Sequence, residues 1–324
     1  MRRKSDLPNQ RQPPPATPVK QTGNHIRKTM NTPSRMPNRL ADTPYNDSPF
    51  FTPTRYAENS DYNSSPIKQI LSIPFEYSIN EQFDNIYHVS IKHQNFVVKR
   101  CNVMELQIYQ KLNSIKTLED LLNSNNHIMP TFMSTPFVIM PFCTPLDKLM
   151  YAYELMPLLL VKQFTRQLFQ GLAYIHSNNI LHGDIKPPNI LIYDAEIPLK
   201  CSQPMDVDHH EFANRLYISD FSVSQQEPFA MMEYGDPLYY SPEAAQTTSL
   251  KADIFSAGLV IYELLENIIM PQNGDELYKA VRNNDFSFSR QDSQIIAVIL
   301  NCCEKNKDKR WSAATVLGYL ENEE

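Results

Sequence analysis

The sequence predicts an α+β fold in which a small β-rich part precedes a larger helical part, with a disordered tail before both. Three features along the chain indicate this order. Residues 1–66 are poor in aliphatic residues, residues 74–100 contain short β-branched and aromatic runs, and helical periodicity dominates from about residue 145. The length of 324 residues allows one large domain or two moderate ones, and the hydrophobic fraction of 42% is enough for a sizeable core.

The first part of the chain is rich in Pro, Asn, Ser, Thr and Arg. Such a segment buries too little apolar surface to offset its chain entropy, so we expect residues 1–70 to form a disordered regulatory tail. Proline-directed kinases act on Ser/Thr-Pro pairs, so the pairs in the tail indicate either regulation or the ordinary composition of disorder. They are Thr17-Pro18, Thr32-Pro33, Thr43-Pro44, Ser48-Pro49, Thr52-Pro53 and Ser65-Pro66.

The tail and the rest of the chain carry opposite net charges. Residues 1–66 have ten Lys/Arg and five Asp/Glu, about +5, which leaves about −11 for the remainder of a chain whose net charge is −6. An acidic folded part argues against nucleic acid as the main ligand. No apolar run approaches the roughly 20 residues that span a bilayer, so we expect no membrane segment. Five cysteines without metal-ligand spacing or disulfide density indicate a reduced compartment.

The β-rich part contains several predicted strands. Residues 75–79, 86–91 and 96–99 are β-branched or aromatic and are separated by polar breaks, and residues 137–140 form an apolar run typical of a buried strand. Between them, the sequence predicts a helix over residues 103–122. On that helix, one face is expected to carry Met104, Ile108, Leu112 and Ile115.

The most informative segment is His182-Gly183-Asp184-Ile185-Lys186-Pro187-Pro188-Asn189. It lies between apolar residues at helical spacing and a short β-type run, so we expect a loop between a helix and a strand. Phosphoryl transfer from ATP needs a carboxylate, an ammonium and an amide close together, as this segment has. Asp184 would orient the attacking hydroxyl and accept its proton, Lys186 would offset charge on the moving phosphate, and Asn189 would hold a metal ion.

Further motifs flank this loop in a characteristic order. Upstream is Phe96-Val97-Val98-Lys99; downstream are Asp220-Phe221-Ser222, Ser241-Pro242-Glu243 and Lys309-Arg310-Trp311. In this order, residues from about 75 to 322 resemble a eukaryotic protein kinase. The resemblance implies a two-lobed protein-kinase fold of the α+β class over residues 71–323, with an N-lobe to about residue 140 and a C-lobe from about residue 141. It also implies ATP and Mg²⁺ as cofactors and a protein substrate.

The resemblance implies roles for single residues in nucleotide binding. Lys99 would hold the α- and β-phosphates and pair with a glutamate, and Asp220 would bind Mg²⁺. Met140 and Cys143, after the strand at 137–140, would meet the adenine ring as the hinge; a plain linker between the lobes is the alternative interpretation. The glutamate is either Glu105, which matches the family pattern better but lies only six residues after Lys99, or Glu119, which has a more usual separation.

The resemblance also implies structural roles. His182 would brace the catalytic loop, Asp253 would support its backbone, and Glu243 and Arg310 would form a buried ion pair.

Three departures from the family pattern affect the expected activity. Residues 79–87, where kinases have a glycine-rich loop over the phosphates, contain no glycine, so we expect weak or unusual nucleotide binding there. Ser222 replaces the glycine of the magnesium motif. Gly183 stands where many kinases have an arginine that reads activation-loop phosphorylation, which argues against that mode of activation.

Two segments resemble the Wee family of kinases more narrowly. They are Glu233-Tyr234-Gly235-Asp236 and Met270-Pro271-Gln272-Asn273-Gly274-Asp275, the second followed by Arg282; a polar insertion at about 194–214 also fits. The resemblance implies phosphorylation of an inhibitory tyrosine on a cyclin-dependent kinase, with a nuclear (or cytoplasmic) location. A pseudokinase that binds a partner and a Ser/Thr kinase with another substrate remain the alternatives. Acidic and histidine residues at 206–211 are expected to be a solvated loop rather than a metal site.

Overall fold

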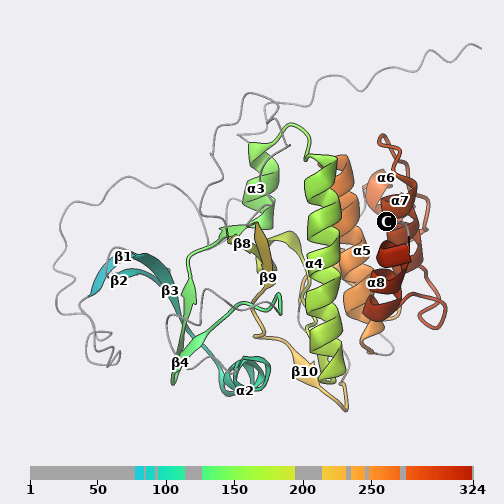
Figure 1. Ribbon diagram of the computed structural model, residues 1–324. Coiled ribbons are helices and arrows are strands. Elements are labelled where there is room, and N and C mark those ends of the chain that lie inside the picture. The colour runs from blue at the N-terminus through green and yellow to red at the C-terminus, as the bar shows by residue number, and fades with distance from the viewer. Residues whose placement is uncertain are drawn as a thin grey trace, which may run out of the picture. The chain divides into compact units, whose positions relative to one another are not determined.

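The structure is a computed structural model that describes residues 77–83, 85–91, 94–113, 126–193, 214–230, 235–244, 248–270 and 275–322, all within the unit Ser48–Glu324. The predicted tail, its Ser/Thr-Pro pairs and residues 194–213 of the insertion lie outside these ranges. Along the described residues a β-sheet comes first and helices follow, which confirms the predicted α+β order (Figure 1).

The first sheet has five strands, and every neighbouring pair is antiparallel. Its order is β1 (Tyr77–Phe83), β2 (Ile86–Ile91), β3 (Gln94–Arg100), β5 (Phe137–Pro141) and β4 (Phe132–Ser134). All five residues of β5 are buried, as predicted from its continuous apolar run.

The first hairpin spans the segment where the phosphate-covering loop is expected, and its first strand is longer than predicted. The strand predicted to end at residue 79 continues to Phe83, and β2 begins at Ile86 opposite it. Antiparallel pairing therefore runs through most of residues 79–87, with one irregularity between Ile79 and Glu81. Since no glycine interrupts this segment, the ladder hydrogen bonds continue almost to the turn.

Helix α2 (Val103–Leu112) is shorter than predicted. Its C-cap residue Asn113 is extended, and the side-chain amide of Asn113 donates to the Met129 carbonyl at 2.9 Å, so the helix ends there rather than at residue 122. The buried face also differs, because Met104 is 46% exposed. The residues of α2 that are buried are Glu105, Ile108, Tyr109 and Leu112.

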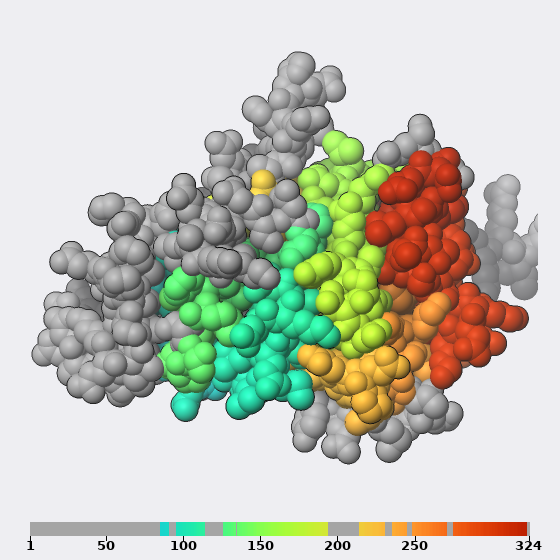
Figure 2. Space-filling view, turned by 60° about the horizontal axis from the view of Figure 1, so that its bottom comes forward, coloured from blue at the N-terminus to red at the C-terminus, as the bar shows by residue number. Residues whose placement is uncertain are grey.

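The C-terminal end of α2 is tied to helix α4 (Leu158–Ser177). Tyr174 donates its hydroxyl to the Leu112 carbonyl at 3.0 Å, and the Lys111 ammonium donates to the Asn178 carbonyl at 2.8 Å. In Figure 2 the teal residues of this region adjoin the yellow-green residues of α4 in one continuous surface. Helix α2 is thus joined directly to the helical part of the chain.

The helical part surrounds α5 (Lys251–Glu266), which is buried from Ala252 to Leu265. Helices α4 and α7 pack against α5, and α8 packs against α4. At Gly258 an added Cβ would lie 2.7 Å from the Cys303 sulfur, and both Cys302 and Cys303 are buried in the core. The other helices are α3 (Leu146–Ala152), α6 (Glu276–Arg282), α7 (Ser293–Cys302) and α8 (Ala313–Asn322).

The described chain also contains short strands and 3-10 turns between the longer helices. They are β6 (Thr144–Pro145), β8 (Ile190–Tyr193) and β9 (Arg215–Ile218) in one sheet, β7 (Ile180–Leu181) with β10 (Gln225–Gln226) in another, and the 3-10 turns η4 (Pro187–Asn189) and η5 (Pro237–Tyr239). Among the described residues, no helix combines the length and apolar character needed to cross a membrane.

Candidate active site

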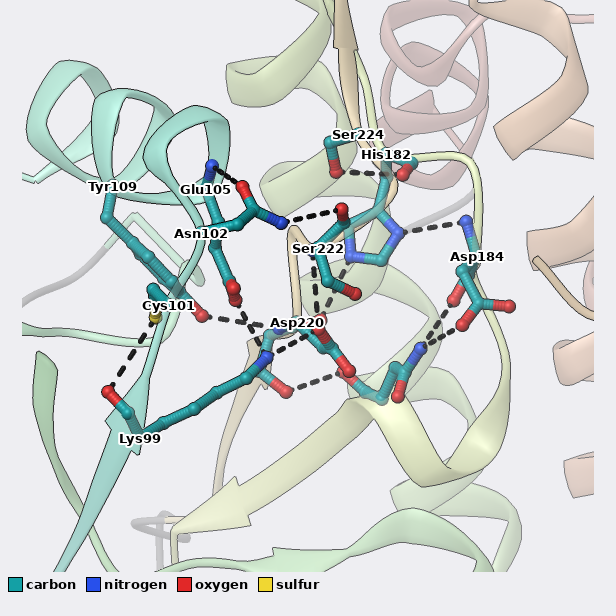
Figure 3. Close-up of polar contacts among 12 residues, drawn as sticks. Lys99, Cys101, Asn102, Glu105, Tyr109, His182, Asp184, Asp220, Ser222 and Ser224 are labelled. Carbon is teal, nitrogen blue, oxygen red and sulfur yellow. Dashed lines mark hydrogen bonds and ion pairs between the residues drawn. The ribbon is translucent and has the colours of Figure 1, made fainter. Parts of the chain in front are cut away.

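Lys99 lies between two carboxylates that come from different parts of the chain (Figure 3). Its ammonium is 2.7 Å from Glu105 Oε1 and 2.6 Å from Asp220 Oδ1. Burial alone would lower the pKa of Lys99, but Asp220 and Glu105 outweigh it and the pKa is raised. Burial likewise opposes ionisation of Asp220, yet Lys99 lowers the pKa of that carboxyl to about 2. Lys99 and Asp220 therefore remain charged at neutral pH.

The pairing of Lys99 with Glu105 resolves the choice that the sequence left open. Glu105 is the third residue of α2, and its side chain is almost fully buried beside Lys99. A six-residue separation suffices because α2 begins directly after β3, without an intervening loop of the usual length. Glu119 lies outside the described residues.

Asp184 lies at the centre of a second group of bonds. Its Oδ2 accepts from the Lys186 ammonium at 3.0 Å and from the Asn189 amide at 2.8 Å, and its Oδ1 accepts from the backbone N–H of Asp236 at 2.9 Å. The Asn189 amide nitrogen is used in bonds to Asp184, so its amide oxygen is the atom that would act as a metal ligand. The sequence did not single out Asp236 for this contact, although it lies in a segment noted for its resemblance.

Asp253 of α5 supports the backbone at the start of the catalytic loop, the segment from His182 to Asn189. Its two oxygens accept from the backbone N–H groups of His182 and Gly183, each at 2.9 Å, and from His176 Nε2 at 2.9 Å. Burial opposes the charge, but the bonds to His176 and the backbone lower the pKa of Asp253. The predicted supporting role of Asp253 is confirmed.

The segment Asp220-Phe221-Ser222 is held by an aromatic cluster that the sequence analysis did not predict as a unit. The ring centroids of Tyr109 and Phe221 are 5.1 Å apart, and those of Phe221 and His182 are 5.0 Å apart, both edge-on. The backbone N–H of Asp220 donates to the Tyr109 hydroxyl at 3.3 Å. His182 also contacts the Ser219 carbonyl through Nε2 at 2.9 Å, which confirms its bracing role. The sequence could have indicated Tyr109 as a site residue, because it lies four residues after Glu105 and therefore on the same helix face.

The segment after residue 235 lies directly against the catalytic loop. Arg282 of α6 donates to the carbonyls of Pro237 at 2.9 Å and Leu238 at 2.7 Å, and also to that of Tyr240. Farther along, Glu243 and Arg310 form the predicted ion pair, with two bonds of 2.6 and 2.9 Å. The bonds from Arg282 and the pair between Glu243 and Arg310 therefore hold the backbone that follows Asp236 at two points.

A pocket opens between the first sheet and β8, beside Lys99. It contains both residues predicted for the hinge, Met140 and Cys143, together with apolar side chains from β2, β3 and β8. Apolar walls with Lys99 and Asp220 among the lining residues suit a nucleotide base and its phosphates, and the carboxylate of Asp220 with the amide oxygen of Asn189 is the hard oxygen donor set that Mg²⁺ prefers. The lining residues are Ile86, His88, Val97, Lys99, Tyr109, Met140, Pro141, Phe142, Cys143, Pro145, Leu191, Ser219 and Asp220.

The fold and this site define an ATP-dependent phosphotransferase, and residues 84–319 match the protein kinase domain family. This match covers most of the chain, which therefore belongs to the protein kinase family. Membership implies ATP and Mg²⁺ as cofactors and a protein as substrate.

Three individual protein kinases are similar to this chain over different lengths. The chain is 26% identical over 279 residues to "Mitosis inhibitor protein kinase mik1" of Schizosaccharomyces pombe, covering 78% of this chain and 44% of that protein. It is 34% identical over 126 residues to "Mitosis inhibitor protein kinase SWE1" of Candida albicans, covering 37% and 9%. It is 28% identical over 197 residues to "Serine/threonine-protein kinase STK11" of Rattus norvegicus, covering 55% and 39%. The chain spans less than half the length of each of these relatives.

Proposed function

We propose that this kinase restrains mitotic entry by phosphorylating an inhibitory tyrosine on a cyclin-dependent kinase. The similarity to two proteins named as mitosis inhibitor kinases supports this proposal. A Ser/Thr kinase matches over 197 residues, between the 279 and 126 residues of the two mitosis inhibitor kinases, so residue specificity is the part of the proposal that most needs an experiment. A nuclear (or cytoplasmic) location belongs to the same proposal.

One structural observation carries the proposal. Asp236, from the first Wee-like segment, and Arg282, which follows the second, bond along one stretch of backbone beside the catalytic loop although more than 40 residues separate them. Asp236 donates its N–H to Asp184, and Arg282 holds the carbonyls of the next two residues. Asp236 and Arg282 thus order one stretch of backbone beside the candidate catalytic carboxylate, while residues 233–234 and 271–274 of the Wee-like segments lie outside the described residues.

Within this proposal each site residue has one role. Asp184 accepts the proton of the substrate hydroxyl, and Lys186 offsets charge beside it. Lys99, held by Glu105, would bind phosphate oxygens, and Asn189 and Asp220 would hold Mg²⁺, which neutralises charge on the transferred group when bound. Met140 and Cys143 would contact the base from the edge of the pocket.

The test is an assay of the purified full chain with a cyclin-dependent kinase, its cyclin and magnesium-ATP, followed by mapping of the modified residue. We expect phosphotyrosine, and no product from Asp184→Asn at an unchanged melting temperature. Product confined to serine or threonine would overturn the tyrosine proposal. Binding of magnesium-ATP without any product on this target would overturn the choice of substrate.

A further inference from the structure

The connection between β3 and α2 consists of two residues only, Cys101 and Asn102. Cys101 is buried, and its backbone N–H donates to the Pro136 carbonyl at 3.0 Å. Two residues span at most about 7 Å, so the start of α2 cannot move far from β3 unless the first turn of the helix unwinds. Glu105 lies in that first turn, which makes its position depend directly on this short connection.

The side chain of Asn102 bonds in two directions (Figure 3). Its Oδ1 accepts from the backbone N–H of Glu105 at 2.8 Å and caps α2. Its Nδ2 donates to the backbone carbonyl of Ser222 at 3.2 Å. One amide therefore joins the first turn of the helix that carries Glu105 to the segment that carries Asp220.

These bonds lie at the end of α2 opposite to its contacts with α4. The Leu112 carbonyl and Lys111 are bonded to Tyr174 and Asn178 at the other end. Helix α2 is thus held at both ends against the larger part of the chain. Many kinases control activity by moving this helix and its glutamate into place.

We propose that Asn102 is a positioning residue that keeps Glu105, Lys99 and Asp220 assembled in the nucleotide-free kinase, so that α2 does not act as a movable switch. The inference rests on the proposed roles of Lys99 and Asp220 and is independent of the protein substrate. It also accounts for the two-residue connection, which a helix that swings outward during each activation cycle would not tolerate.

Two substitutions separate this role from ordinary helix capping. Asn102→Asp and Asn102→Ser keep an oxygen that caps α2, but neither has the amide N–H that reaches Ser222. We expect both variants to melt near the wild-type temperature and to show a three- to tenfold higher KM for magnesium-ATP, about the effect of one lost hydrogen bond. The serine variant controls for the added charge of aspartate. If both variants match the wild type in KM and kcat, the bond to Ser222 has no positioning role and the proposal fails.

Lengthening the connection tests the same idea without removing a side chain. Insertion of three glycines between Cys101 and Asn102 keeps the cap but frees the helix from β3. We expect faster amide hydrogen exchange across residues 103–112 in the nucleotide-free protein and weaker magnesium-ATP binding by calorimetry. Unchanged exchange over these residues in both the insertion variant and Asn102→Ser would contradict the proposal. This measurement remains readable if the wild-type chain phosphorylates no cyclin-dependent kinase, so the two proposals fail separately.

Discussion

Gly235 lies against the backbone of Gly183, so closely that a Cβ on Gly235 would be 2.6 Å from the Gly183 carbonyl oxygen. Both residues have positive φ, +115° at Gly235 and 82° at Gly183. The next residue in each segment is an aspartate, and Asp236 donates its N–H to Asp184. Direct backbone contact therefore orders the segment beside Asp184, at the position where other kinases pair an arginine with a phosphate.

Substitution Gly235→Ala is expected to lower kcat at least tenfold, because the added methyl group must push this segment away from Asp184. The measurement is steady-state phosphorylation together with the melting temperature. Gly318→Ala is the matched control: it lies in α8 and an added Cβ there meets nothing within 4 Å. The control should keep full activity and gain up to about 1 kcal/mol of stability. Full activity in Gly235→Ala would show that the close contact between Gly235 and Gly183 is not needed for catalysis.

Substitution Tyr109→Phe is expected to weaken magnesium-ATP binding modestly while leaving the fold intact. The ring contact with Phe221 stays, but the hydroxyl that accepts the Asp220 N–H is removed, at a cost of about 0.5–1.5 kcal/mol. Calorimetric titration of wild type and variant gives the comparison. Tyr109→Leu, which also removes the ring, should lose more; equal affinities in all three proteins would contradict the proposed support of Asp220.

Breaking the pair between Glu243 and Arg310 is expected to cost about 3–5 kcal/mol of unfolding free energy when Arg310 is replaced by methionine. The loss is large because Arg310 is fully buried and Glu243 would keep an unpaired charge. Urea unfolding measures it, and the double variant with Glu243→Gln should recover part of the loss. A change below about 1 kcal/mol in the single variant would show that the pair contributes little.

The stability of the protein should depend on pH through Glu263. This fully buried carboxyl accepts from the Tyr239 hydroxyl, and burial raises its pKa from 4.5 to about 8. A carboxyl with a raised pKa in the folded state holds its proton more tightly there, so its contribution is present below about pH 4.5 and is lost as the pH rises through about 8.

Thermal unfolding of Glu263→Gln between pH 5 and 8 tests this dependence. The variant should show a flatter stability profile than the wild type over this range. Glu276→Gln, at an exposed position at the start of α6, is the control and should retain the wild-type slope. Parallel profiles for wild type and Glu263→Gln would mean that another group controls the slope.

Lys99→Met is expected to abolish measurable stabilisation by magnesium-ATP and to raise the pKa of Asp220 from about 2 toward its ordinary value, because Lys99 is the main group that lowers it. Stabilisation by Asp220 is present above its unfolded pKa of 3.8 and lost as pH falls toward 2; the variant lacks this contribution, so it should be less stable at neutral pH and lose less stability between about pH 4 and 2 than the wild type. Thermal-shift titration and acid unfolding provide the two measurements. Undiminished stabilisation by nucleotide would exclude Lys99 from the binding site.

The sequence alone determined the fold class and the identity of the charged groups in the cleft. The reason is local: apolar spacing before His182 and after Asn189 defines a helix and a strand, and the chemistry between them has few other uses. Likewise Phe96-Val97-Val98-Lys99 and Leu216-Tyr217-Ile218-Ser219-Asp220 each present an apolar run with a charged residue at or soon after its end.

Only the tertiary structure decided how these segments meet. Spacing along the chain argued against Glu105 as the partner of Lys99, whereas the immediate start of α2 after β3 makes a six-residue separation sufficient. The bonds from Tyr109 and Asn102 to the Asp220 segment, and from Asp236 to Asp184, join residues 52 to 120 positions apart. Such contacts depend on the packing of whole helices and strands, which no local pattern of polar and apolar residues encodes.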